Sequence, residues 1–234
     1  DRLSNIVYSH LKPKYQIVDQ RYVLSNSLSA TERLLVATQW KDLVTQLKTQ
    51  ITELIGKERA EAEKSGENFI DPTNVIPVID TSGSMEGAQV QDKAIGLGIL
   101  ATELSSMPGC LISFSDKPQV FNLNMSGTHD VFDHFLAIMN GPTGFSTNID
   151  ATYECMLNLM QTAKVEKTDF AMLFLTDGQF DSQVVFESTG STSNARSRYS
   201  PLENFGKTAL GRLESRFASC GYNMPRTVFW NLNA

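Results

Sequence analysis

Residues Val75–Met85 read VIPVIDTSGSM, an almost unbroken apolar run that stops at Asp80 and continues into hydroxyl and glycine residues. This composition predicts a fully buried strand whose carboxyl end opens into a polar loop. Ligands of open α/β sheets bind outside the carboxyl ends of the strands, so we expect Asp80, Ser82 and Ser84 to share a crevice there. One carboxylate and two hydroxyls are oxygen ligands of the kind that Mg²⁺ prefers, but they fill only part of its coordination shell.

Two later segments offer oxygen ligands that complete such a shell. Residues Ala171–Gly178 read AMLFLTDG, which predicts a second buried strand that ends at Asp177. Residues 140–148 read NGPTGFSTN and place two threonines, Thr143 and Thr147, ahead of a helical pattern that begins near Ile149. Either threonine is a candidate ligand.

These three segments resemble the metal-ion-dependent adhesion site of von Willebrand factor A (vWA) domains. The matching pieces are Asp-x-Ser-x-Ser after an apolar strand, a threonine ahead of a mid-domain helix, and Thr-Asp-Gly at the end of a later strand. The resemblance runs from about Asn74 to the end of the chain, and the family's spacing from threonine to helix favours Thr147. The implied metal ligands are Asp80, Ser82, Ser84, Thr147 and Asp177.

The resemblance implies a function as well as a ligand set. In vWA domains the bound ion is Mg²⁺, with Mn²⁺ or Ca²⁺ as alternatives, and it takes an Asp or Glu side chain from a protein partner into an open coordination position. We therefore expect a non-catalytic, Mg²⁺-dependent protein-interaction module. No nucleotide or organic cofactor is expected.

A narrower resemblance is to an uncharacterised intracellular vWA family of plants, fungi and giant viruses. It rests on Gln39–Val44, Phe114–Pro118, Asn148 and Val228–Leu232. That family is distantly similar to the Ro ribonucleoprotein autoantigen, whose vWA domain follows a helical-repeat ring that binds RNA. The alternative function is thus a Ro-like ribonucleoprotein component in which the vWA part is mainly a scaffold.

The order of predicted elements indicates an α/β fold with a doubly wound, mostly parallel sheet and one antiparallel edge strand. The edge pair is expected at Cys110–Phe114 and Gln119–Leu123. Helices are expected at 88–105, 131–139, 149–160 and 201–220, and a last strand at 227–232. The resemblance to vWA domains implies a further helix and strand, which are not expected within residues 71–234.

The first part of the chain is predicted to be helical. Ser29 and Glu32 form a capping-box pattern, and a long helix follows with an apolar stripe from Trp40 to Leu54. Leu3–Asn26, with tyrosines at intervals of seven, is interpreted as packing surface on helical turns. We expect residues 1–70 to be the end of a helical domain with its linker, and 71–234 to be the vWA domain.

Composition limits the cellular setting and the partners. The 234 residues carry a net charge of -6, which argues against nucleic-acid binding by bulk charge but leaves room for a local basic patch. Three cysteines, an odd and sparse count, favour a reducing compartment. No signal peptide is evident and no apolar stretch approaches the roughly 18 residues of a membrane span. A cytoplasmic protein is expected.

Catalytic interpretations fit the sequence poorly. Asp80 could be a phosphoryl-transfer nucleophile only with an acid two residues later, and that position is Ser82. Neither Ser82 nor Ser84 lies in a Gly-x-Ser-x-Gly elbow. Gly96 and Gly98 fall inside a predicted helix, which favours close helix packing over a phosphate loop. His129 and His134 lack zinc-binding spacing and are expected at the surface or a boundary.

Overall fold

The computed structural model of the chain describes residues 15–19, 21–24, 28–66, 69, 71–86, 90–107, 109–115, 117–123, 129–142, 148–164, 170–178, 180–181, 199–200 and 207–232. Its centre is a five-stranded sheet of order β5-β4-β3-β6-β9. The strands are β3 (Val75–Asp80), β4 (Cys110–Phe114), β5 (Val120–Asn122), β6 (Ala171–Thr176) and β9 (Arg226–Asn231). All neighbours pair in parallel except β4 and β5. The predicted mostly parallel sheet with one antiparallel edge strand is confirmed.

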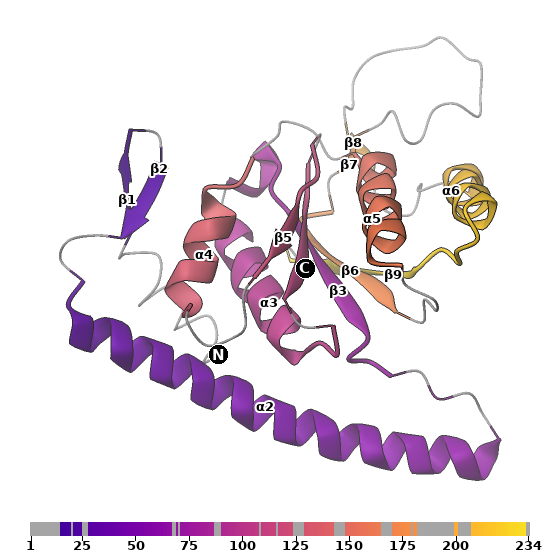
Figure 1. Cartoon of the computed structure of the whole chain (residues 1–234), viewed down its shortest axis with the longest axis horizontal. Coiled ribbons are helices and arrows are strands. Elements are labelled where there is room, and N and C mark those ends of the chain that lie inside the picture. Colours follow the sequence, from indigo (N-terminus) through magenta and orange to yellow (C-terminus); the bar gives the residue numbers. More distant parts are fainter. Residues whose placement is uncertain are drawn as a thin grey trace.

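Helices cover both faces of this sheet, as Figure 1 shows. On one face α3 (Val90–Leu104) and α4 (Val131–Met139) pack on a core that includes Ile79, Leu111 and Leu175. On the other, α5 (Ile149–Ala163) and α6 (Lys207–Ser219) pack on one that includes Val78 and Phe174. Alternate residues of one strand therefore serve the two cores, and the α/β fold with helices on both faces is confirmed.

Close packing between α3 and β3 depends on a glycine. A Cβ atom at Gly98 would lie 2.7 Å from Cγ1 of Ile79, the residue that precedes Asp80. Gly98 thus lets the helix approach the strand, as the position of this glycine inside the helix predicted.

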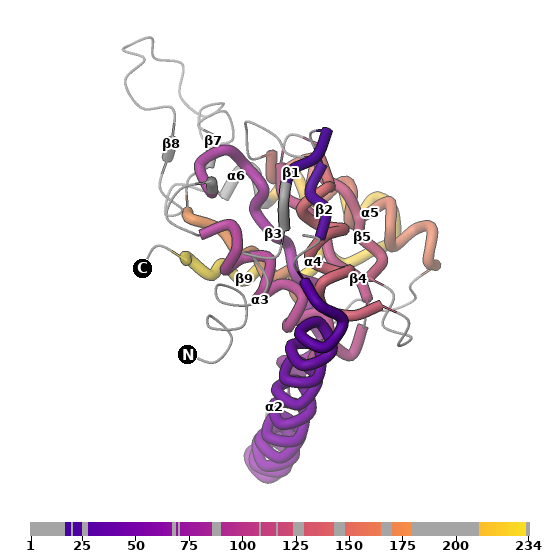
Figure 2. The backbone as a smooth tube through the Cα atoms, turned by 90° about the vertical axis from the view of Figure 1, so that its left-hand side faces the viewer, coloured from indigo at the N-terminus to yellow at the C-terminus, as the bar shows by residue number. Residues whose placement is uncertain are grey.

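Helix α2 (Ala30–Ser65) begins at the predicted capping box, in which the Ser29 hydroxyl accepts the Glu32 N–H and the Glu32 carboxylate accepts the Ser29 N–H. Its first half buries Val36, Trp40, Leu43 and Val44 in the same core as α3 and α4. The helix then runs past the sheet (Figures 1 and 2), so Leu54, expected on the buried stripe, is 56% exposed. Among the described residues, no helix has the length and apolarity to cross a membrane.

Residues 15–24 correct the helical interpretation of the N-terminal stretch. They form an antiparallel hairpin of β1 (Tyr15–Val18) and β2 (Arg21–Leu24), while residues 1–14 lie outside the described part. Both strands are rich in β-branched and aromatic residues, and Asp19 between them adopts a left-handed φ of 48°. Asn140, at the end of α4, holds the hairpin: its side chain accepts the Tyr22 N–H and donates to the Tyr22 carbonyl, each at 2.8 Å.

Two shorter strands, β7 (Phe180–Asp181) and β8 (Tyr199–Ser200), pair with each other outside the main sheet. They follow β6 in the chain. Ser82 precedes a short 3₁₀ helix, η3 (Gly83–Glu86), which lies between β3 and the segment before α3.

Replacing Trp40 by alanine should destabilise the whole domain by about 3 to 5 kcal/mol, because the side chain is buried against α3 and α4. Urea unfolding followed by far-UV circular dichroism measures this change. Leu54→Ala on the same helix is the control, with an expected change within about 0.5 kcal/mol. Equal losses of stability in the two variants would contradict the packing of α2 in one core with α3 and α4.

Candidate functional site

The carboxyl ends of β3 and β6 lie side by side in the middle of the sheet. Parallel pairing places Ile79 opposite Leu175, so Asp80 and Asp177 follow at the same edge. Asp80 is fully buried, Asp177 is 6% exposed and Ser82 is 3% exposed. The two carboxylates are close enough for the charge of Asp177 to raise the pKa of Asp80. The predicted convergence of Asp80, Ser82 and Asp177 is therefore present.

Two hydrogen bonds fix the Asp80 carboxylate. One oxygen accepts the backbone N–H of Ser82 at 3.0 Å, and the other accepts the hydroxyl of Thr176 at 2.7 Å. Thr176 Oγ1 also accepts the Gly178 N–H at 3.1 Å, which ties the loop after Asp177 to the same hydroxyl. Sequence analysis did not assign this role to Thr176, although its position as the threonine of Thr-Asp-Gly on a strand beside Asp80 is a signal for it.

The hydroxyls of Ser82 and Ser84 lie 3.0 Å apart. This separation is an ordinary hydrogen bond, and it also matches neighbouring ligands around Mg²⁺, because Mg–O distances of about 2.1 Å at right angles give oxygens about 3.0 Å apart. The turn that carries them is fixed by the Met85 N–H, which donates to the Ser82 carbonyl, and by the fully buried Met85 side chain. Both hydroxyls are thus held beside Asp80.

Burial raises the pKa of Asp80 to about 6, and repulsion from Asp177 adds to the rise. Hydrogen bonds from Ser82 and Thr176 oppose it without cancelling it. An ionised Asp80 is therefore costly at neutral pH when no cation is near. A divalent cation bound between the two carboxylates would remove this cost, so the donor set fits such an ion.

The threonine ligand is not placed. Thr147 and its competitor Thr143 both lie outside the described residues. The helix expected after the ligand threonine is present as α5. Asn148 is its N-cap and accepts the Ala151 N–H at 2.9 Å. Within the described residues, no three His, Cys, Asp or Glu side chains group together to hold a metal. A cation at this crevice would depend on two carboxylates and on hydroxyls.

Comparison with known families gives one match. A family model described as "Domain of unknown function (DUF7788)" matches residues 74–234, from the residue before β3 to Ala234. No curated protein matches the chain. The matched region includes the four described candidate ligands.

The raised pKa of Asp80 makes the stability of the metal-free protein depend on pH. The unfolded aspartate has a pKa near 3.8 and the folded one near 6, so the folded protein binds the extra proton between these values and stability falls as pH rises through them. Relative to Asp80→Asn, the wild type should lose about 2 kcal/mol between pH 4 and pH 7, because part of the effect is already lost at pH 4. Urea unfolding in EDTA across this range measures the difference.

Asp150→Asn is the control for this measurement, because Asp150 is an aspartate at the start of α5 with a half-exposed side chain. Its stability difference from the wild type should change little between pH 4 and pH 7. If the difference in unfolding free energy between the wild type and Asp80→Asn did not vary with pH, the folded protein would not raise the pKa of Asp80.

Proposed function

The chain belongs to the DUF7788 family, whose description assigns no function, and we propose that its α/β domain is a Mg²⁺-dependent protein-binding module of the vWA type. The observation that carries this proposal is the pair of buried carboxylates, Asp80 and Asp177, on adjacent strand ends beside the Ser82 and Ser84 hydroxyls. Burying two like charges together is unfavourable without a counter-ion.

The proposed cation ligands are Asp80, Ser82, Ser84 and Asp177, with Thr147 supplied by the segment before α5. Mn²⁺ or Ca²⁺ could take the place of Mg²⁺, since all three ions bind oxygen ligands. The bound ion would supply a positive charge with a coordination position open to a carboxylate of a partner protein. Two carboxylates just balance a divalent ion, so an incoming acidic side chain meets no excess of negative charge.

The arrangement favours binding over catalysis. Asp80 has both carboxylate oxygens engaged by Ser82 and Thr176, which holds it in one orientation. Ser82, at the position where a phosphatase would need its general acid, shares a hydrogen bond with Ser84 and does not ionise near neutral pH. In this proposal the partner's Asp or Glu is bound without being chemically changed.

Mg²⁺ should raise the melting temperature of the protein relative to EDTA. At ten times Kd, binding at one site adds about 1.4 kcal/mol, which in a domain of this size corresponds to roughly 3 to 6 °C. Differential scanning fluorimetry with MgCl₂ or EDTA measures this shift. Asp177→Asn and Ser82→Ala should lose it, and Asp150→Asn should keep it. A wild type without any shift would refute the cation site.

Thr176→Val should weaken Mg²⁺ binding by about tenfold or more, because it keeps the shape of the side chain but removes the hydroxyl that orients Asp80. Thr176→Ser keeps the hydroxyl and should bind Mg²⁺ nearly as the wild type does. Isothermal titration calorimetry with MgCl₂ compares the two variants. Equal affinities of Thr176→Val and the wild type would mean that Asp80 does not need this hydrogen bond.

Capture of a protein partner from an extract tests the interaction itself. Pull-down by the immobilised wild-type chain in MgCl₂ should retain a partner that EDTA releases and that Asp80→Asn fails to retain. The scaffold alternative expects RNA retention that falls with salt and survives both treatments. If only RNA is retained, and this retention survives EDTA and Asp80→Asn, the scaffold alternative would replace the proposal.

A further inference from the structure

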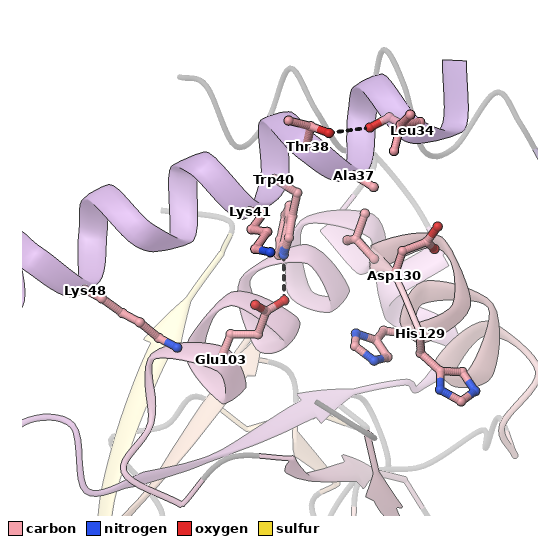
Figure 3. Close-up of a pocket in the computed structure, with 11 residues that line it drawn as sticks. Leu34, Ala37, Thr38, Trp40, Lys41, Lys48, Glu103, His129 and Asp130 are labelled. Atoms are coloured by element: carbon pink, nitrogen blue, oxygen red, sulfur yellow. Dashed lines mark hydrogen bonds between the residues drawn. The ribbon is translucent and has the colours of Figure 1, made fainter. Parts of the chain in front are cut away.

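A second candidate site lies at the other end of the sheet. Ser105 and Ser106, just after α3, donate hydrogen bonds to the carbonyls of Val75 and Thr73, so the end of α3 rests against the start of β3. There α2, the end of α3 and the start of α4 enclose an open groove of about 490 Å³ (Figure 3). The groove is thus separated from the Asp80 crevice by the length of the central strand.

One wall of the groove is apolar and is provided by α2. Leu34 is 68% exposed, and Ala37 follows it on the same side of the helix. Trp40 closes the floor: it is 3% exposed and its indole N–H donates to the Glu103 carboxylate at 2.6 Å. At 490 Å³ the groove falls within the range of roughly 300 to 1,000 Å³ that small-molecule sites occupy.

Two lysines give the groove its charge. Lys41 and Lys48 are seven residues apart on α2, which places them on one side of the helix, and Figure 3 shows both projecting towards the end of α3. Neither ammonium group forms an ion pair with any part of the chain that the structure describes. The two cations thus lie on α2 just beyond the apolar wall formed by Leu34 and Ala37.

The acidic residues of the groove are already engaged. Asp130 accepts two hydrogen bonds from the Arg33 guanidinium, at 2.6 and 3.0 Å, and Glu103 accepts the Trp40 indole N–H. Arg33 therefore balances the charge of Asp130, and the indole hydrogen bond fixes the direction of the Glu103 carboxylate. The imidazoles of His129 and His134, stacked 6.4 Å apart, lie at the end of the groove where α4 begins. His134 is buried, which corrects the expectation that it lies at the surface or a boundary.

We propose that this groove binds a small organic anion, with its carboxylate or phosphate between Lys41 and Lys48 and its apolar body along Leu34 and Ala37. An exposed ammonium attracts an anion only modestly in water, so affinity depends on the apolar contact and the charge together. This site is independent of the cation crevice. Neither the ligands of that crevice nor its metal contributes to the groove.

Isothermal titration calorimetry with 2-naphthyl phosphate, 2-naphthoate, 2-naphthol and inorganic phosphate tests both requirements in the full chain. We expect binding of the naphthyl phosphate or the naphthoate, or both, and the tighter of the two identifies the preferred anion. The neutral naphthol and inorganic phosphate should each bind at least tenfold more weakly. Naphthol binding as tightly as the anions, or no binding of any naphthyl probe, would overturn the proposal.

Variants locate the site. Lys41→Met combined with Lys48→Met keeps the aliphatic stems and should weaken anion binding about tenfold. Lys57→Met, on the same helix but outside the groove lining, should leave it unchanged. Ala37→Phe should fill the groove and prevent binding, with circular dichroism and melting temperature showing that the variant folds. Equal binding by the double-lysine variant and the wild type would refute the site.

A comparison in MgCl₂ and EDTA separates the groove from the cation crevice. Binding of the naphthyl anion should be the same in both solutions. Binding that requires Mg²⁺ would place the anion at the crevice and overturn the groove proposal. If the wild type binds the naphthyl anion but Mg²⁺ does not raise its melting temperature, the proposed function is refuted and the groove proposal stands.

Discussion

The structure of the candidate site depends on one hydrogen bond between strands, from the Thr176 hydroxyl to the buried carboxylate of Asp80. The two residues are 96 positions apart in the sequence, and the parallel pairing of β3 with β6 brings them together. Because Asp80 is shielded from water, this bond is stronger than it would be at the surface, and it sets the direction of the carboxylate. The same hydroxyl orders the loop after Asp177, so both acidic residues are held by one side chain.

Burial of two carboxylates at this edge lowers the stability of the domain, and the core between the sheet and α5 and α6 helps to offset this. Phe174 on β6 contacts Phe114, Tyr153 and Phe229 with ring centroids 5.0 to 6.1 Å apart, and Tyr153 in turn meets Phe217 edge-on at 6.2 Å. Aromatic pairs of this kind stabilise a core beyond the area that they bury. The strand that leads to Asp177 is therefore among the most firmly packed elements, which keeps the acidic edge in place despite the repulsion between its carboxylates.

Local sequence patterns predicted the central sheet because they match the structural environment directly. Val75–Asp80 and Ala171–Thr176 are apolar runs of strand length, and both are buried on both faces. The capping box of α2 was also predictable, since its hydrogen bonds lie within three residues. The β1–β2 hairpin was not predicted, because tyrosines at intervals of seven suit helical turns, while its docking depends on Asn140, 118 positions away from Tyr22. The role of Thr176 likewise follows from a strand pairing that no local pattern specifies.

Helix α3 runs from the acidic edge of the sheet at Asp80 to the contact with α2 at the opposite end of the sheet. It begins after the serine turn beside Asp80 and ends at Leu104, and the carboxylate of Glu103 in its last turn accepts the Trp40 indole N–H. Midway, Gly98 lies against Ile79, so the backbone next to Asp80 cannot shift towards α3 without a steric clash. Packing of α2 on the end of α3 therefore restrains the same helix that supports the acidic edge. This continuity explains why α2, although it precedes the sheet in the chain and extends past it in space, is part of the folded core.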